Sequence, residues 1–186
     1  MVDELDPEMI RAAAAGDLVA FEKIVRAYQQ NIWRFLRRFL GDAAAAEDVA
    51  QEVFLRLYRS LPSFAHQAKF SAWVFKIARN AALDELRRQK RRERLMVAAA
   101  TVAVTDGATG SDGTTGEARV EIEAALAALP DDLRETVVLV EVFGLPYAEV
   151  SDVVGVPVGT IKSRMFRARE RMQDWARCAE EAAGEL

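Results

Sequence analysis

The sequence predicts an all-α fold made of two small helical domains joined by a flexible linker. Three observations support this prediction. Apolar residues recur at helical spacing along most of the chain, no segment alternates in the manner of a β-strand, and one internal stretch lacks large side chains. With 186 residues, of which 51% are hydrophobic, the chain can build one ordinary domain or two small ones, each with a buried core.

The N-terminal domain, residues 1–95, is predicted to contain three main helices. Asp17 is the expected N-cap of the first helix and Asp42 that of the second, because a short acceptor side chain precedes a run of apolar residues at helical spacing. After a short loop at residues 64–69, a third helix is expected with Ser71 as its N-cap.

The flexible linker is predicted at residues 96–118, where Gly, Ala, Ser and Thr replace the large apolar residues. Helical spacing resumes in the C-terminal domain, residues 119–186. Asp131 or Asp132 is the expected N-cap of its second helix. A short helix, a turn at Gly155 and a long final helix complete the domain.

In the stretch from Phe70 to Arg94, the order of the side chains is typical of a protein that binds opened, single-stranded nucleic acid. Aromatic residues come first, a helical run follows, and the stretch ends in six cations within eight residues: Arg87, Arg88, Lys90, Arg91, Arg92 and Arg94. Rings offer stacking surfaces, and arginines bind phosphates. Part of the aromatic set must also pack the core. The mutual repulsion of the cations is tolerated best when a polyanion neutralises them.

Charge is distributed unevenly along the chain, whose formal net charge is −4. Residues 1–94 contain 17 of the 25 Lys+Arg and 13 of the 29 Asp+Glu, so the second half is strongly acidic. Because the positive charge is concentrated in a local patch of an acidic chain, we expect nucleic acid to bind at that patch rather than over the whole surface.

Residues 147–172 have the spacing of a helix-turn-helix. Val154 faces inward on the first helix, Gly155 supplies the turn, and Ile161 and Met165 anchor the second helix. The outward positions of that second helix are then where a recognition helix presents side chains to the major groove. An ordinary helical hairpin with a solvated basic face is the structural alternative.

One strip of the predicted second helix combines acidic, amide and apolar side chains. It consists of Asp48, Gln51, Glu52 and Leu55, which share a helix face. Taken alone, this strip is an ordinary amphipathic surface. Only the segments that follow it in the chain favour a functional role.

The residues predict no catalytic site, metal or cofactor. His66 is the only histidine and Cys178 the only cysteine, so no zinc cluster and no internal disulfide can form. No glycine-rich phosphate loop is present, and catalysis is not expected. The acidic start is unlike a signal peptide and no apolar run approaches a membrane span, so a cytoplasmic setting is expected.

Three segments together resemble signatures of the sigma-70 family of bacterial initiation factors, specifically the small two-domain extracytoplasmic-function (ECF) type. They read DVAQEVFLRLYRSLPSF, FSAWVFKIARNAALDELRR and YAEVSDVVGVPVGTIKSRMFRARERM, in the family's order. The resemblance covers nearly the whole chain. It implies an alternative sigma factor that binds core RNA polymerase and directs promoter-specific transcription initiation, including promoter melting.

The resemblance also implies three binding sites. The clamp helices of the largest polymerase subunit are expected to contact Asp48, Gln51, Glu52 and Leu55. The minus-ten element, with a flipped base in the 64–69 loop, is expected to contact Phe64, Ala65, His66, Lys69, Asn80, Asp84, Arg87 and Arg88. The minus-thirty-five duplex is expected to contact Thr160, Lys162, Ser163, Arg164, Phe166 and Arg167.

Further partners follow from the same resemblance. The flap of the second-largest polymerase subunit is expected to bind the C-terminal domain, and an anti-sigma factor is the expected class of regulator. Two alternative functions would each explain part of the sequence. A stand-alone helix-turn-helix regulator explains residues 147–172 only, and a helical RNA-binding or antitermination factor explains the basic cluster but not a recognition helix.

Overall fold

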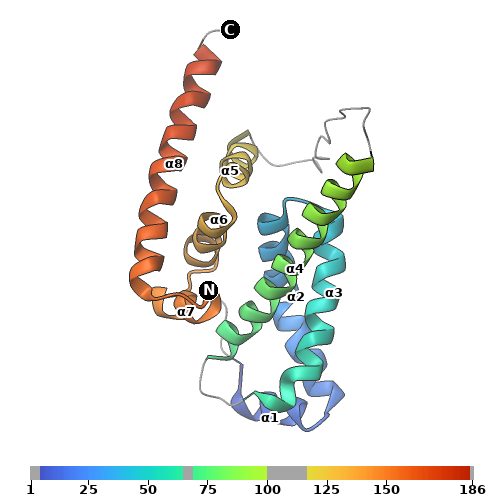
Figure 1. The fold of residues 1–186 in the computed structure, drawn as a ribbon. Helices are drawn as coiled ribbons and strands as arrows, with labels where there is room; N and C mark the ends of the chain where they lie inside the picture. The colour runs from blue at the N-terminus through green and yellow to red at the C-terminus, as the bar shows by residue number, and fades with distance from the viewer. Residues whose placement is uncertain (1–4, 65–68, 100–116, 185–186) are drawn as a thin grey trace.

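The computed structural model describes residues 5–64, 69–99 and 117–184, and all secondary structure in these ranges is helical (Figure 1). This confirms the all-α prediction. The predicted 64–69 loop and linker lie largely outside the described residues. The elements are α1 (Pro7–Ala14), α2 (Leu18–Leu40), α3 (Ala43–Ser60), η1 (Leu61–Ser63), α4 (Phe70–Ala99), α5 (Glu117–Ala127), α6 (Asp131–Val137), η2 (Val138–Val142), α7 (Tyr147–Val154) and α8 (Val158–Gly184).

The core of the N-terminal domain lies where α2, α3 and α4 pack together, with α1 against α2. Its largest fully buried side chains come from all three helices: Ile24, Tyr28, Ile32, Phe35, Leu36 and Phe39 from α2, Leu57 from α3, and Phe70 and Phe75 from α4. The aromatic residues at the start of α4 are therefore scaffold. Burial of such rings is the main stabilising contribution to a helical core of this size.

Two predicted N-caps are confirmed. Asp17 Oδ1 accepts hydrogen bonds from the backbone N–H groups of Val19 and Ala20 at 2.8 and 3.2 Å. Asp42 Oδ1 does the same for the second and third residues of α3, at 2.8 and 3.3 Å. Between the two helices Gly41 adopts φ 77°, a left-handed conformation that ends α2 and that glycine adopts without strain.

Three local features differ from the sequence-based expectation. The sequence pattern did not indicate α1, which begins at Pro7 with Asp6 as its N-cap. α4 begins one residue before Ser71, so this serine lies buried inside the first turn rather than at the cap. Pro130 occupies the cap position of α6, which leaves Asp131 and its neighbour in the first turn, close to the positive end of the helix dipole.

The C-terminal domain places the predicted helix-turn-helix in α7 and α8. Val150 and Val154 of α7 are buried against Ile161 and Met165 of α8. Gly155 ends α7 with φ 77°, and this left-handed residue makes the turn. These contacts confirm the inward positions expected from the spacing.

A π-helical turn, η2, follows α6 where the apolar spacing predicts a continuous α-helix. Its wider hydrogen bonding includes the Phe143 N–H donating to the Val138 carbonyl oxygen at 3.2 Å. Such turns shift the side chains that follow them. Here the residue that follows is Phe143, which leaves the helix and contacts the other domain.

The two domains lie in direct contact, with α7 beside the beginning of α4 (Figure 1). The Phe143 ring packs against Phe75 of α4 at 4.9 Å between ring centroids and against Phe35 of α2 at 6.2 Å. Nη1 of Arg134 donates a hydrogen bond to the Phe39 carbonyl oxygen at 3.1 Å. Burial lowers the pKa of Arg134, which Asp131 partly offsets. No local feature of the sequence indicated this contact.

Candidate nucleic-acid interface

The predicted polymerase strip lies on one outward side of α3. Asp48, Gln51 and Leu55 are exposed, with Leu55 52% exposed, and Glu52 is half-buried. The opposite side of α3 carries the buried residues Val53 and Leu57. Because these residues pack into the core, the strip faces outward. An exposed leucine beside carboxylates is a suitable mixed surface for a protein partner.

A charged groove between α3 and α4 is lined by Asp48 and Glu52 of the strip and by Arg88, one of the predicted minus-ten residues. At its side, Nε of Arg56 donates to Glu52 at 2.8 Å and Nη1 donates to Asp84 at 2.9 Å, while Arg87 Nη1 contacts the other oxygen of Asp84 at 3.2 Å. The hydrogen bond from Arg56 lowers the pKa of Glu52. Hydrogen bonds to Glu52 and then Asp84 raise the pKa of Arg56. We call this set, Glu52, Arg56, Asp84 and Arg87, the surface network.

The described residues of the predicted base-capture loop lie at its two ends. Phe64 packs on Trp73 at 4.9 Å and on Phe70 at 5.3 Å between ring centroids, which anchors the start of the loop to α4. Lys69, at the other end, contacts a carboxylate oxygen of Glu149 in α7 at 2.6 Å. Ala65 and His66 lie outside the described residues.

The remaining predicted minus-ten residues lie along α4. Asn80, Arg87 and Arg88 are exposed. Arg88 and Arg92 contact Glu85 at 3.4 and 3.9 Å, and both arginine side chains remain more than half exposed. Glu85 itself is only 12% exposed, whereas the arginine side chains reach solvent and are accessible to a phosphate.

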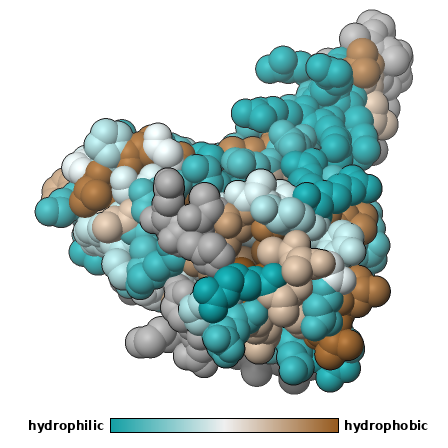
Figure 2. Space-filling view, turned by 90° about the horizontal axis from the view of Figure 1, so that it is seen from below, coloured by the Kyte–Doolittle hydropathy of each residue, from teal (hydrophilic) through white to brown (hydrophobic). Residues whose placement is uncertain are grey.

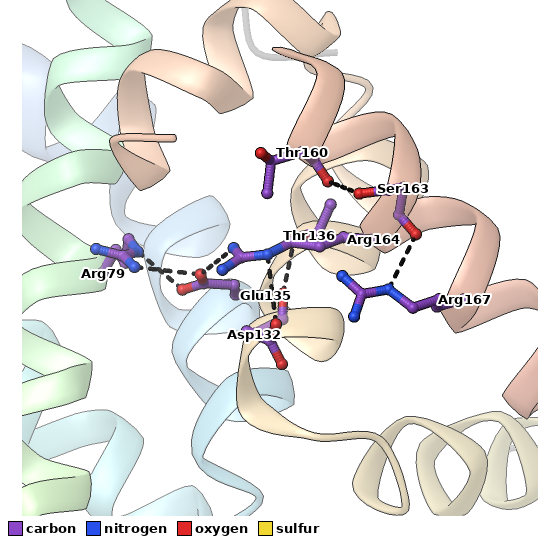
Figure 3. Close-up of polar contacts among 8 residues, drawn as sticks. All are labelled: Arg79, Asp132, Glu135, Thr136, Thr160, Ser163, Arg164 and Arg167. Atoms are coloured by element: carbon purple, nitrogen blue, oxygen red, sulfur yellow. Dashed lines mark hydrogen bonds and ion pairs between the residues drawn. The ribbon is translucent and has the colours of Figure 1, made fainter. Parts of the chain in front are cut away.

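On α8, the predicted minus-thirty-five residues divide into two groups. Lys162, Ser163, Phe166 and Arg167 are exposed, with Phe166 65% exposed. Ser163 donates to the carbonyl oxygen of the half-buried Thr160 at 2.9 Å, and Arg167 Nε donates to the Ser163 carbonyl oxygen at 3.3 Å (Figure 3).

Arg164 faces the opposite way from that exposed group. Its side chain is 15% exposed and contacts two carboxylates of α6, Asp132 at 3.4 Å and Glu135 at 3.3 Å (Figure 3). In this conformation the Arg164 guanidinium is bound by the protein itself.

Glu135 is the centre of a second network, one the sequence interpretation missed. Its side chain is 2% exposed and accepts from Arg79 of α4 at 2.8 and 3.2 Å as well as from Arg164 of α8 (Figure 3). We call Arg79, Asp132, Glu135 and Arg164 the buried network. A buried carboxylate requires such partners because an unpaired charge in a core is very costly. Glu135 lies in the polar segment DDLRET, before the apolar run that begins at Val137, so no local pattern in the sequence marked it as buried.

The surface otherwise offers no broad apolar face in the view from below, where hydrophobic residues are scattered among hydrophilic ones (Figure 2).

Ser151, an inward-facing polar residue of α7, donates to the Val156 carbonyl oxygen at 2.6 Å and so stabilises the turn. None of the helices described is long and apolar enough to cross a membrane.

An exposed helix-turn-helix and a separate helix that carries a cationic cluster indicate a class of protein, the helical DNA-binding proteins. Comparison with known families is more specific. Residues 24–92 match Sigma-70 region 2, and residues 119–172 match Sigma-70, region 4.

Curated relatives agree with these matches. The chain is 36% identical over 170 residues to "ECF RNA polymerase sigma factor SigC" of Mycobacterium tuberculosis, covering 91% of this chain and 90% of that protein. It is 35% identical over 176 residues to "ECF RNA polymerase sigma factor SigW" of Bacillus subtilis, covering 88% and 92%. The chain therefore belongs to the sigma-70 family and, within it, to the ECF sigma factors.

A solved structure has the same fold over most of its length. It is the sigma factor RpoE of Bartonella quintana in complex with the anti-sigma factor NepR, with a TM-score of 0.72, 25% identity, and coverage of 84% of this chain and 96% of that one. The structure of CnrH in complex with the cytosolic domain of CnrY has a TM-score of 0.70 at 24% identity and agrees in fold.

Proposed function

We propose that the chain is an alternative sigma factor that binds core RNA polymerase and directs promoter-specific transcription initiation, including promoter melting. One observation carries the proposal: both sigma-70 regions occur in one chain and in the family's order. A stand-alone helix-turn-helix regulator has no use for the first of these regions. As an initiation factor the protein acts with the polymerase in the cytoplasm and performs no catalysis of its own.

We assign the three surfaces different tasks. The strip of α3 binds the clamp helices of the largest polymerase subunit, and its exposed Leu55 supports this role. The outward side of α4, with Asn80, Asp84, Arg87 and Arg88, faces the opened minus-ten strand. The exposed group on α8 reads the minus-thirty-five duplex, and the C-terminal domain contacts the flap.

The energetics favour a factor that works only on the polymerase. Extruding a base costs a few kcal/mol, while stacking returns about 1–3 kcal/mol per base, so the loop alone holds a promoter open poorly. Polymerase fixes both domains at promoter spacing and so raises their effective concentration on DNA. We therefore expect weak promoter binding by the free chain and tight binding by the holoenzyme.

Regulation by an anti-sigma factor is part of this proposal. The similar structure of RpoE contains such a partner, NepR, and covers most of this chain. This likeness supports a protein regulator of the anti-sigma class.

Run-off transcription with core polymerase on a promoter library tests the function directly. The expected result is RNA from a restricted set of templates that share two elements, and only when the chain is present. Equal transcription from all templates, or tight and specific promoter binding by the free chain at physiological salt, would instead favour the stand-alone regulator.

A further inference from the structure

We propose that Asp84 is a positioning residue of the minus-ten surface, which orients Arg87 towards the backbone of the opened strand and does not read a base. The inference rests on the proposed function, because that function supplies the strand. Asp84 is the only acidic residue among the predicted minus-ten residues. A carboxylate repels phosphates, so its place on this surface requires a reason other than attraction to DNA.

Both carboxylate oxygens of Asp84 are engaged within the protein. Oδ2 accepts a hydrogen bond from Arg56 Nη1 at 2.9 Å, and Oδ1 accepts one from Arg87 Nη1 at 3.2 Å. The carboxylate is therefore held between two guanidinium groups, one from α3 and one from α4. The amino group of a base would have to compete with these charged donors, and hydrogen bonds between two charged groups are the stronger ones. Asp84 is thus poorly suited to read a base edge.

The conformation of Asp84 is fixed from the neighbouring helix α3. Arg56 donates from Nε to Glu52 at 2.8 Å and from Nη1 to Asp84, so its guanidinium is bound on both sides. The Arg56 side chain is only 31% exposed. Because a guanidinium is planar and rigid, two hydrogen bonds to different carboxylates fix its orientation. The direction of the Asp84 carboxylate follows from that orientation.

Arg87 is the member of the surface network that reaches furthest into solvent. Its side chain is 75% exposed, and it lies one helical turn after Asp84, at the spacing at which side chains of a helix meet. A guanidinium has several N–H groups, so Arg87 can keep its contact with Asp84 while it binds a phosphate. An arginine that is already held in one conformation loses less side-chain entropy on binding. Asp84 therefore favours strand binding through Arg87.

This role of Asp84 predicts an effect opposite to that of its charge. Removing a carboxylate from a DNA-binding helix reduces the repulsion of phosphates and, on that ground alone, should tighten binding. If Asp84 orients Arg87, its removal should weaken binding instead. The loss should be the same on every strand sequence, because phosphate contacts carry no sequence information.

Asp84→Asn tests the proposal because it removes the charge and keeps the shape of the side chain. The matched control is Glu93→Gln, which removes one negative charge from an exposed position of the same helix. Asp84→Ala removes the acceptor as well as the charge and should give the same result as Asp84→Asn. Arg87→Gln and the double variant Asp84→Asn/Arg87→Gln complete a double-mutant cycle.

The measurement is the fluorescence anisotropy of a labelled forked duplex with each holoenzyme at several salt concentrations. The single-stranded part of the duplex carries the minus-ten sequence of a template that is transcribed in the run-off assay. The logarithmic salt dependence of Asp84→Asn should be shallower than that of Glu93→Gln by about 0.7, so the ratio of their affinities changes about fivefold over a tenfold range of salt. Arg87→Gln should show the same decrease, and the double variant should show no further decrease, because all three lose the same phosphate contact.

Replacing each base of the single-stranded part in turn separates positioning from base recognition. Asp84→Asn should lose the same factor in affinity on every sequence. A loss confined to one base would show that Asp84 reads that base, and would overturn the proposal. Tighter binding by Asp84→Asn, or losses from Asp84→Asn and Arg87→Gln that add in the double variant, would also overturn it.

The outcome remains distinguishable from a failure of the proposed function. If the wild type directs transcription with core polymerase while Asp84→Asn binds the forked duplex like Glu93→Gln, only the further inference fails. If the wild type directs no transcription from any template, the proposed function fails and the further inference fails with it.

Discussion

The surface network and the buried network use the same side chains, arginine and carboxylate, in opposite settings. The surface network connects α3 with α4 inside one domain, and its arginine Arg56 is 31% exposed. The buried network connects α4, α6 and α8 across two domains around Glu135. Burial rather than geometry separates them, since their shortest distances are equal at 2.8 Å.

The difference shows what each network can contribute. Water screens the surface network, so its ion pairs add little to stability and can exchange partners when polymerase or DNA arrives. The buried network is costly to break because each group that loses its partner stays out of water. Variants of Arg79 and Arg56 test this contrast directly, and a variant of Arg167 adds an exposed arginine outside both networks; they follow from the largest expected effect to the smallest.

Arg79→Ala should cause the largest loss. It removes both hydrogen bonds that Arg79 donates to Glu135 and leaves only the contacts from Arg164. Because the carboxylate stays largely buried, we expect a loss of about 3 kcal/mol in the free energy of unfolding, measured by urea denaturation of the full chain. A loss below about 1 kcal/mol would mean that the buried network behaves like a surface pair.

Arg167→Ala should cost less and should affect recognition rather than stability. Arg167 is exposed on α8, and one good base contact contributes about 1–3 kcal/mol to discrimination. Holoenzyme binding to the upstream promoter element should weaken by that amount, measured by competition between matched and mismatched duplexes. The double variant Asp48→Ala/Gln51→Ala is the control, and should weaken polymerase binding in a pull-down while leaving that discrimination intact. Equal loss of polymerase binding in Arg167→Ala would contradict the assignment.

Arg56→Met should have the smallest effect, which is visible mainly in the titration of Glu52. Arg56 lowers the pKa of Glu52 below its ordinary value of 4.5. The stabilisation from this pair is therefore present above pH 4.5 and is lost as the pH falls through the lower, folded value. Carboxyl NMR should show the Glu52 midpoint returning towards 4.5 in the variant, with little change in unfolding by urea. A midpoint that does not move would show that Arg56 is not the cause.

Local structure was predictable where a short segment determines it. Asp17 and Asp42 cap their helices as expected, because a cap needs only the side chain and the next three backbone N–H groups. The turn at Gly155 follows from the freedom of glycine in the left-handed region. Ser71 failed as a cap because packing of Phe70 extends α4 by a residue, and burial outweighs a capping preference.

The contact between domains was not predictable, because nothing local requires it. Arg79 and Glu135 are 56 positions apart, and their pairing depends on how two separate cores meet. η2 is similar, since the apolar spacing of residues 137–142 fits an α-helix as well as a π-helical turn. The candidate site could be located on its helices from the sequence, but the residues that hold Arg164 away from the exposed face could not.

Arg164 has a consequence for how a mutational scan of α8 would be interpreted. Its guanidinium is held by two carboxylates of α6 within its own domain and is also assigned to the minus-thirty-five duplex. Replacing it would remove a partner of the buried Glu135 and a proposed DNA contact at the same time. A scan of single positions would report the two losses as one, and only a double-variant cycle with Glu135 would separate them.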